Sequence, residues 1–191
     1  RNSSCNSWAD RNSSSLSSSA AIAARCRAAG IPFVLGPLNG GAGVLMSGLD
    51  YERTVLAGIQ LGIMQACLDV VLPYVRERKQ FGRPIGEFQA LQFRLADMAT
   101  DLEAARLMVL RGAWAIDNDH PEKTKWCAMA KRMATDTGFQ VANEALQLHG
   151  GYGYLKDYPL ERIVRDLRVH RILEGTNEVM RMIVARELAK G

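Results

Sequence analysis

Long stretches of helical apolar periodicity, separated by short turns, dominate the chain after Gly48. From Asp50 to Arg78 apolar side chains recur every three or four residues, which is the spacing of one face of an α-helix. Pro73 should bend or interrupt this helix because it has no backbone N–H, and Gly82 followed by Pro84 two residues later should end it. The residues expected on its buried face are Val55, Leu56, Ile59, Ile63, Cys67, Val70, Val71 and Tyr74.

Two further long helices are predicted, at Glu87–Asp117 and Glu122–His149, with a turn between them at Asn118–Pro121. The pair Gly150-Gly151 should stop the second of them, since glycine adopts the left-handed conformation that commonly ends a helix. The apolar stripe expected on the first is formed by Phe88, Leu91, Leu95, Met98, Leu102 and Ala105.

Two shorter helices complete the pattern. Pro159 can open one that extends to Val169, and Thr176 can cap another at Asn177–Ala189. Because no strand-like alternation of useful length is present, the predicted fold is all-α, an up-and-down helical bundle. A ferritin-like di-iron bundle is a rival architecture, but the sequence lacks its Glu-x-x-His pairs.

Residues 1–38 differ in composition from residues 39–191, so we expect two regions that meet there. Arg1–Ser19 is rich in Ser and Asn without apolar periodicity, which predicts a poorly ordered segment. Ala20–Ala29 could form a short helix ended by Gly30. The Arg- and Ser-rich composition is faintly similar to a transit peptide and is equally consistent with the edge of a fragment.

The bulk composition indicates a soluble globular domain. Of 191 residues, 48% are hydrophobic and 23% are charged, which is ordinary for a domain with a real core. No apolar run approaches the length needed to span a bilayer, so no membrane association is expected. The net charge of +4 indicates either a solvated basic surface or one that meets anions such as pyrophosphate or CoA phosphates. Nucleic-acid binding is disfavoured because the basic residues are not interleaved with aromatic ones.

The four cysteines, Cys5, Cys26, Cys67 and Cys127, form no CxxC pair. No histidine lies at metal-binding spacing beside them, so no metal site is predicted. Cys67 and Cys127 fall inside helical patterns and are expected to be core thiols, which fits a reducing compartment.

Two motifs could bind an anionic or flat ligand. Glu77–Pro84 places Arg78, Lys79 and Arg83 beside a glycine turn, where they could hold a pyrophosphate, although cations are favourable at any helix C-terminus. Gln147–Tyr154 has three glycines in four positions, which lets a backbone approach a ligand closely. A helix cap followed by a turn would have the same composition.

Two more motifs place charges at helix starts. Ile172–Glu178 puts Glu174 just before a helix and beside Gly175, which leaves room for a substrate. A general base needs a carboxylate placed in this way. Leu49–Arg53 has acidic and basic residues side by side. Ordinary charged flanks of helices look the same, so the residues alone leave both interpretations open.

In this order and spacing the motifs resemble the acyl-CoA dehydrogenase family. The phrases GLDYERTVLAG, ERKQFGRPIGEFQ, LADMAT, QLHGGYGY, RIVRD and ILEGTNEVMR all have close counterparts there. The resemblance covers the chain from about Gly43 to its C-terminus and corresponds to the C-terminal helical domain of the family. It implies the bundle predicted above, without the family's N-terminal helical domain and β-domain.

The resemblance also implies an FAD-dependent reaction. In the family a carboxylate removes the α-proton of an acyl-CoA thioester, FAD accepts the β-hydride, and the product is a trans-2-enoyl-CoA. Electrons then pass to an electron-transferring flavoprotein, and the enzymes are homo-oligomers, commonly tetramers or dimers. The implied location is the cytoplasm for a bacterial protein and the mitochondrial matrix for a eukaryotic one.

The family's functional positions carry over residue by residue. Glu174 matches the catalytic base of most members, and Asp50, Arg53 and Gly175 match substrate contacts. The positions that match FAD contacts or lie beside them, some on the neighbouring subunit's flavin, are Arg78, Phe81, Gln89, Gln147, Leu148, His149, Gly150, Gly151, Thr176, Asn177 and Glu178.

A second glutamate complicates the assignment of the base. In isovaleryl-CoA dehydrogenases the base occupies the position of Glu52 and glycine occupies that of Glu174, whereas this sequence has glutamate at both. The segment around Glu52 looks isovaleryl-like, and the part after Cys127 looks closer to isobutyryl- and short-chain enzymes. The implied substrate is therefore a short or branched acyl-CoA, with Glu174 as the expected base and Glu52 as the alternative.

Two other functions stay open. A helical bundle that only oligomerises or binds a partner would need none of the flavin residues, so an FAD titration separates it from a dehydrogenase. An acyl-CoA oxidase would be reoxidised by oxygen and not by a flavoprotein acceptor.

Overall fold

The computed structural model describes residues 24–30 and 39–190, in two units that comprise residues 1–48 and 49–191. In the first unit residues 24–28 are helical, and the chain turns at Gly30, whose φ of +66° suits a glycine. This agrees with the short helix expected before Gly30. The beginning of that helix and the whole of Arg1–Ser19 lie outside the described residues.

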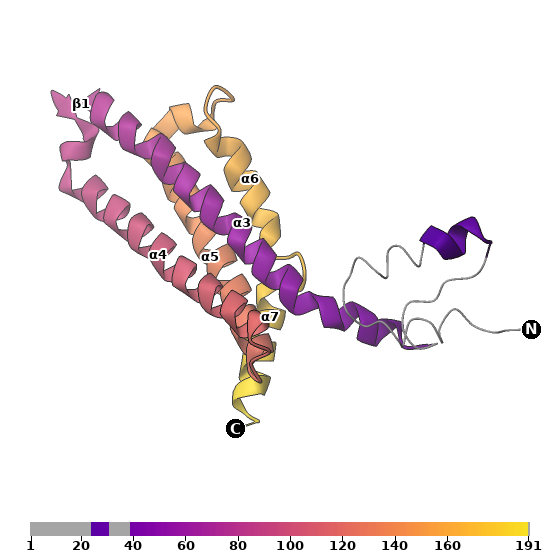
Figure 1. Ribbon diagram of the computed structural model, residues 1–191. Coiled ribbons are helices and arrows are strands. Elements are labelled where there is room, and N and C mark those ends of the chain that lie inside the picture. The colour runs from indigo at the N-terminus through magenta and orange to yellow at the C-terminus, as the bar shows by residue number, and fades with distance from the viewer. Residues whose placement is uncertain (1–23, 31–38, 191) are drawn as a thin grey trace, which may run out of the picture. The chain divides into compact units, whose positions relative to one another are not determined.

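Five long or medium helices account for most of the described chain, so the predicted all-α class is confirmed. Two short 3₁₀ segments and a two-stranded hairpin connect them (Figure 1). The helices are α3 (Gly41–Glu77), α4 (Gln89–Asp117), α5 (Lys123–His149), α6 (Leu160–His170) and α7 (Asn177–Leu188); the connecting segments are β1 (Lys79–Gln80), β2 (Arg83–Pro84), η1 (Ile85–Glu87) and η2 (Gly150–Tyr154).

The helix α3 differs from its prediction in two respects. It begins at Gly41 and not near Asp50, and it continues through Pro73 without a break. Proline in a helix interior loses one hydrogen bond, and the residues on both sides of Pro73 are packed into the same core, which holds the helix together at that point.

A small hairpin, β1–β2, follows α3 and was not predicted. Lys79 pairs with Pro84 and Gln80 with Arg83, antiparallel. Phe81 and Gly82 form the turn with φ values of 51° and 83°, and two positive φ values are typical of tight hairpin turns. Strands of two residues are too short to show any alternation in the sequence.

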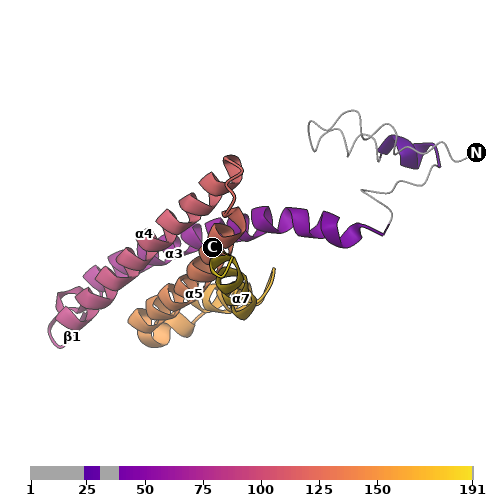
Figure 2. The same cartoon turned by 90° about the horizontal axis from the view of Figure 1, so that it is seen from below.

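The helices from α3 to α6 alternate in direction, as predicted, whereas α7 continues in the direction of α6 (Figure 1). Thr124 near the start of α5 donates a hydrogen bond to the Asp50 carboxylate at 2.8 Å, and Tyr74 donates to the carbonyl of His149 at the end of α5 at 3.3 Å. Asp50 precedes Tyr74 in α3, just as Thr124 precedes His149 in α5, so α3 and α5 run parallel. The hairpin returns the chain along α4, which runs antiparallel to both (Figures 1 and 2).

One hydrophobic core joins α3, α4, α5 and α6, and Met180 and Ile183 of α7 pack with Ala128 of α5 in a second, smaller cluster. The stripe predicted on α4 is confirmed, because Met98, Leu102 and Ala105 are buried and the rest of the stripe packs against them. The predicted face of α3 is only partly right. Val55 and Ile59 are 65% and 48% exposed. The helix is apolar around most of its circumference, so periodicity did not distinguish the side that packs on α4 and α5. The buried residues of α3 in this core are Ala57, Met64, Cys67, Leu68, Val71 and Val75.

The apolar character of α3 also corrects the expectation about membrane-spanning length. An 18-residue window of this helix has a mean hydropathy of 1.9, which is long and apolar enough to cross a bilayer by length and composition. Isolated polar residues such as Gln60 and Asp69 interrupt the apolar run without lowering the mean much. In the bundle, one side of this segment forms the centre of the core.

Cys67 and Cys127 are core thiols, as predicted. Neither side chain is exposed, and burial raises the pKa of the Cys67 thiol to about 12 and also raises the pKa of Cys127. Both are therefore protonated and unreactive at neutral pH.

The central position of Met64 gives a test of this packing. We expect Met64→Ala to lower the free energy of unfolding by about 2–5 kcal/mol, because a fully buried side chain leaves a cavity. Met182 on α7 is exposed, so Met182→Ala should change the same quantity by no more than about 0.5 kcal/mol. Urea denaturation followed by circular dichroism measures both, and equal effects of the two substitutions would contradict the core described here.

Candidate functional site

The four motifs singled out in the sequence meet in pairs at two places along α3. The hairpin motif lies beside the glycine-rich motif near the C-terminal end of α3, and Leu49–Arg53 lies near Ile172–Glu178 at the other end. Glu52 and Glu77 are 25 residues apart on one helix, which corresponds to about 40 Å at 1.5 Å per residue. The two sites are therefore separate, and α3 sets the distance between them.

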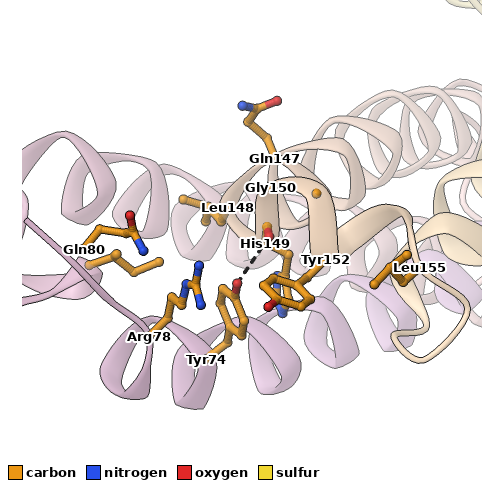
Figure 3. Close-up of a pocket in the computed structure, with 11 residues that line it drawn as sticks. Tyr74, Arg78, Gln80, Gln147, Leu148, His149, Gly150, Tyr152 and Leu155 are labelled. Atoms are coloured by element: carbon orange, nitrogen blue, oxygen red, sulfur yellow. Dashed lines mark hydrogen bonds between the residues drawn. The ribbon is translucent and has the colours of Figure 1, made fainter.

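The first site is a cavity of about 420 Å³ between the end of α3, the hairpin and the end of α5 (Figure 3). It brings together Arg78 and the whole Gln147–Gly151 segment, as expected. Phe81 and Gln89 do not line it, because Phe81 is 93% exposed at the hairpin tip and Gln89 is exposed at the start of α4. The lining residues are Tyr74, Arg78, Gln80, Ile85, Gln147, Leu148, His149, Gly150, Gly151, Tyr152 and Leu155.

His149 presents an unsatisfied acceptor in this cavity. Its ring is 2% exposed, and its Nδ1 lies 2.9 Å from the carbonyl of Ala145, which can only accept, so Nδ1 carries the proton. Nε2 is left with a lone pair and has no hydrogen-bond partner among the residues that the structure describes. Burial lowers the pKa of His149, against the opposing effect of the Ala145 bond, so the neutral ring is favoured. A buried acceptor of this kind matches a ligand that donates a hydrogen bond.

Aromatic rings hold His149 and a cation in place. Tyr74 stacks on His149 with ring centroids 4.0 Å apart, and the Arg78 guanidinium lies 5.2 Å from the centroid of the Tyr152 ring. The stacking on Tyr74 fixes the orientation of the His149 ring. The Arg78 guanidinium can donate two hydrogen bonds to one anionic group. The sequence analysis did not identify Tyr74 as a site residue, although its position four residues before Arg78 places both on one side of α3.

The second site surrounds Glu174. Its backbone has a φ of 55°, and Gly175 follows with a φ of 94°, so the carboxylate sits on a tight turn between α6 and α7. Oε2 of Glu174 is buried, and no group within residues 24–30 and 39–190 forms a hydrogen bond with it. Burial raises the pKa of this carboxyl, the Glu52 carboxylate raises it further, and Lys131 and Arg53 oppose both effects. An unpartnered carboxylate with a raised pKa on a strained turn is typical of a functional group.

The residues of α3 complete this second site. Glu52 is exposed and acts electrostatically on Glu174, so the two candidate bases lie in the same region. Arg53 is buried, and its guanidinium lies 3.5 Å from the Asp50 carboxylate, which also accepts a hydrogen bond from Thr124 at 2.8 Å. These contacts tie the start of α3 to α5.

The first turn of α7 is anchored by the residues after Gly175. Thr176 caps the helix as predicted, accepting from the backbone N–H of Val179 at 3.3 Å. Asn177 is buried and accepts from the Lys131 ammonium at 2.9 Å, whereas Glu178 is exposed.

Two residues that the sequence analysis missed hold this turn. Lys131 on α5 is fully buried, and Asp136 accepts bonds from Arg171 at 2.7 Å and Asn177 at 2.8 Å. A lysine inside the apolar run CAMAKRMA was a signal that this position is unusual, since lysine is almost never fully buried without partners. Nothing in the sequence marked Asp136.

The fold and its sites thus define a helical bundle with a buried, unpartnered carboxylate at one end and an aromatic, cationic cavity at the other. Residues 39–189 match the family described as acyl-CoA dehydrogenase, C-terminal domain. The chain belongs to the acyl-CoA dehydrogenase family and corresponds to its C-terminal domain.

Relatives and solved structures agree with this assignment. Isovaleryl-CoA dehydrogenase from Oryza sativa subsp. japonica is 50% identical over 157 residues, and isobutyryl-CoA dehydrogenase from Dictyostelium discoideum is 48% identical over 157 residues. Each match covers 82% of this chain but 38% of the relative. Butyryl-CoA dehydrogenase from Megasphaera elsdenii superposes with a TM-score of 0.78 at 40% identity, covering 81% of this chain and 40% of that chain. The chain therefore spans about two fifths of the proteins that it matches.

A chain in a structure described as the electron transferring flavoprotein of Acidaminococcus fermentans is also similar. It superposes with a TM-score of 0.79 at 43% identity, covering 82% of this chain and 41% of that chain.

The buried neutral histidine predicts a specific dependence of stability on pH. Burial lowers the pKa of His149 in the folded state. The contribution of the neutral ring to the free energy of unfolding is therefore complete above the ordinary histidine pKa of about 6.5. It is lost as the pH falls from there through the lowered pKa, because the unfolded state then binds more protons. We expect the free energy of unfolding to decrease over this interval and His149→Gln to reduce the decrease. Burial also lowers the pKa of His170, so part of the dependence should remain. Urea denaturation between pH 5 and 8 measures the slope, and an unchanged slope in His149→Gln would disprove the assignment.

Proposed function

We propose that this chain is the catalytic C-terminal domain of an FAD-dependent acyl-CoA dehydrogenase that acts on a short or branched acyl-CoA. The observation that carries this proposal is the Glu174 carboxylate, which has a buried, unpartnered Oε2 and a raised pKa. A general base has to reach a weakly acidic C–H next to a thioester carbonyl, and a carboxylate with a free oxygen meets that requirement. The raised pKa makes Glu174 a stronger base once it is ionised.

The first cavity has the properties required by the adenosine and pyrophosphate end of FAD. The lone pair on His149 Nε2 can accept from an exocyclic amine, and Arg78 can pair with a phosphate. Gly150 has a φ of 58°, and a Cβ on Gly151 would meet nothing within 4 Å, so the backbone there is accessible to a flat ligand. When bound, FAD supplies the acceptor for the β-hydride.

At the second site, the substrate's α-carbon would lie beside Glu174, whose carboxylate removes one proton as the β-hydride leaves. Gly175 presents no side chain there, since a Cβ would meet Met180 at 2.9 Å. Asp50 and Arg53, which match substrate contacts of the family, would meet the CoA arm. The names of the relatives, isovaleryl-, isobutyryl- and 2-methylacyl-CoA dehydrogenase, support a short or branched acyl group. The product would be the 2-enoyl-CoA.

The separation of the two sites supports a homo-oligomer. An extended FAD molecule is shorter than the roughly 40 Å along α3 that divides the cavity from Glu174. One flavin therefore cannot contact both sites of one chain, and the cavity of one subunit would serve the active site of another.

An electron-transferring flavoprotein is the proposed acceptor, in keeping with the similar chain from Acidaminococcus fermentans. We also propose that the domain begins near residue 39. The proposed location is the cytoplasm for a bacterial protein and the mitochondrial matrix for a eukaryotic one.

Because this chain would supply mainly the adenosine and pyrophosphate contacts of the proposed flavin site, we expect it to bind FAD weakly by itself. In the family the β-domain surrounds much of the isoalloxazine ring, which would otherwise remain in water. The purified chain should lose added FAD on dialysis, as measured by absorbance at the flavin band. Retention of a stoichiometric amount would refute this expectation, and Arg78→Ala would then show whether the retained flavin occupies the cavity.

The choice of base can be tested in a chimera. Residues 39–191 would replace the corresponding part of the Dictyostelium isobutyryl-CoA dehydrogenase, which is 48% identical over the match. We expect Glu174→Gln to slow flavin bleaching by substrate in a single turnover by about 10²–10⁴-fold, because the amide cannot accept the proton. Glu52→Gln should have a far smaller effect, and so should the control Glu103→Gln, which changes an exposed glutamate on α4 that lies in neither site. If Glu52→Gln abolishes bleaching and Glu174→Gln does not, Glu52 is the base.

A further inference from the structure

Lys131 is a buried cation on the face of α5 that packs into the bundle. Its side chain has no exposed surface, and the neighbouring Ala128, Ala130 and Ala134 are also completely buried. Burying an ammonium is costly, and an apolar side chain of similar size at such a position is often neutral or stabilising. The presence of lysine there therefore requires an explanation other than core packing.

The Lys131 ammonium contacts the turn that carries Glu174. It donates hydrogen bonds to the carbonyl of Gly175 at 2.8 Å and to Oδ1 of Asn177 at 2.9 Å. These acceptors flank Thr176, and Gly175 is itself the second of the two residues with positive φ. A single group on α5 thus holds the C-terminal side of the strained Glu174–Gly175 pair and the first turn of α7.

The same ammonium acts on the Glu174 carboxyl through its charge. Lys131 and Arg53 are the two cations that oppose the upward shift of the Glu174 pKa caused by burial and by Glu52. Arg53 already faces the Asp50 carboxylate, whereas the hydrogen bonds of Lys131 go to a neutral carbonyl and a neutral amide. Its positive charge is therefore not neutralised by a directly bonded carboxylate.

We propose that Lys131 is a positioning residue for the Glu174 carboxylate, holding its turn in the left-handed conformation and keeping the carboxylate ionised near neutral pH. This inference rests on the proposed function of Glu174 as the base. Lys131 does not contact the reacting atoms in this role. Desolvation lowers the pKa of Lys131 to about 8, so the ammonium is still mostly charged at pH 7. The charged groups that face it are Glu174 on the turn, Asp136 on α5, Arg53 on α3, Glu178 on α7 and His170 on α6.

The test measures the ionisation of Glu174 directly in the full chain. Glutamate labelled with ¹³C at Cδ is titrated by NMR, and Glu174→Gln and Glu52→Gln assign the two resonances. We expect Lys131→Met to move the pKa of Glu174 upward. The matched control is Thr135→Val, which removes the Thr135–Asn177 hydrogen bonds at 2.9 and 3.2 Å from the same network but leaves the ammonium. An equal upward shift in both variants, or none in Lys131→Met, would overturn the proposal.

A second measurement does not require the Lys131→Met variant to fold. In the unsubstituted chain, the Glu174 Cδ resonance should show an additional inflection near pH 8, where the Lys131 ammonium loses its proton. The Lys131 Cε resonance should titrate at the same pH. Absence of the inflection, with Lys131 seen to titrate there, contradicts the electrostatic coupling. The outcome is independent of the chimera experiment: the coupling can fail while Glu174 remains the base, and Glu174 can prove not to be the base while the coupling holds.

Discussion

The burial of one side of α3 against α4, α5 and α6 is the constraint on which the other features of this structure depend. The helix contributes to the core along most of its length, from Ala57 to Val75. It also carries residues of both candidate sites, with Glu52 and Arg53 near one end and Tyr74 at the other. A packed helix transmits position without bending, so the distance between the two sites follows from the helical rise and the number of residues between them.

The parallel arrangement of α3 and α5 completes both sites with a second helix. At one end, Thr124 and Lys131 of α5 contact Asp50 and the turn after α6, and at the other, His149 stacks on Tyr74. The residues of the two candidate sites lie toward opposite ends of this helix pair, and between them the packing is mostly apolar, with Gln60 and Thr135 as buried polar exceptions. The core therefore provides a rigid spacer, and the chemistry is located where each helix ends and backbone groups become available.

The charges around Glu174 show how a bundle can hold a reactive carboxylate. Burial and the neighbouring Glu52 favour the protonated acid, whereas Lys131 and Arg53 favour the anion. Because these effects oppose one another, the pKa of Glu174 depends on the balance between them, and it lies above the ordinary value for glutamate. The strained φ values of Glu174 and Gly175 persist because Lys131, Asn177 and the cap at Thr176 hold the turn from two helices.

Much of this molecule was determined by the sequence itself. The extent of α4, α5 and α7, the cap at Thr176, the buried thiols and the apolar stripe of α4 follow from local periodicity and from residues with strong local preferences, which act over a few positions along the chain. The four motifs were recognisable for the same reason.

The tertiary structure alone decided which side of α3 is buried, because that helix is apolar nearly all round. It also decided which motifs meet and separated Phe81 and Gln89 from the cavity. It revealed Lys131 and Asp136 as well, whose partners are 35 to 46 residues away in the chain. Such pairings depend on how helices pack against one another, and no local pattern of side chains records which distant residue a buried charge will face.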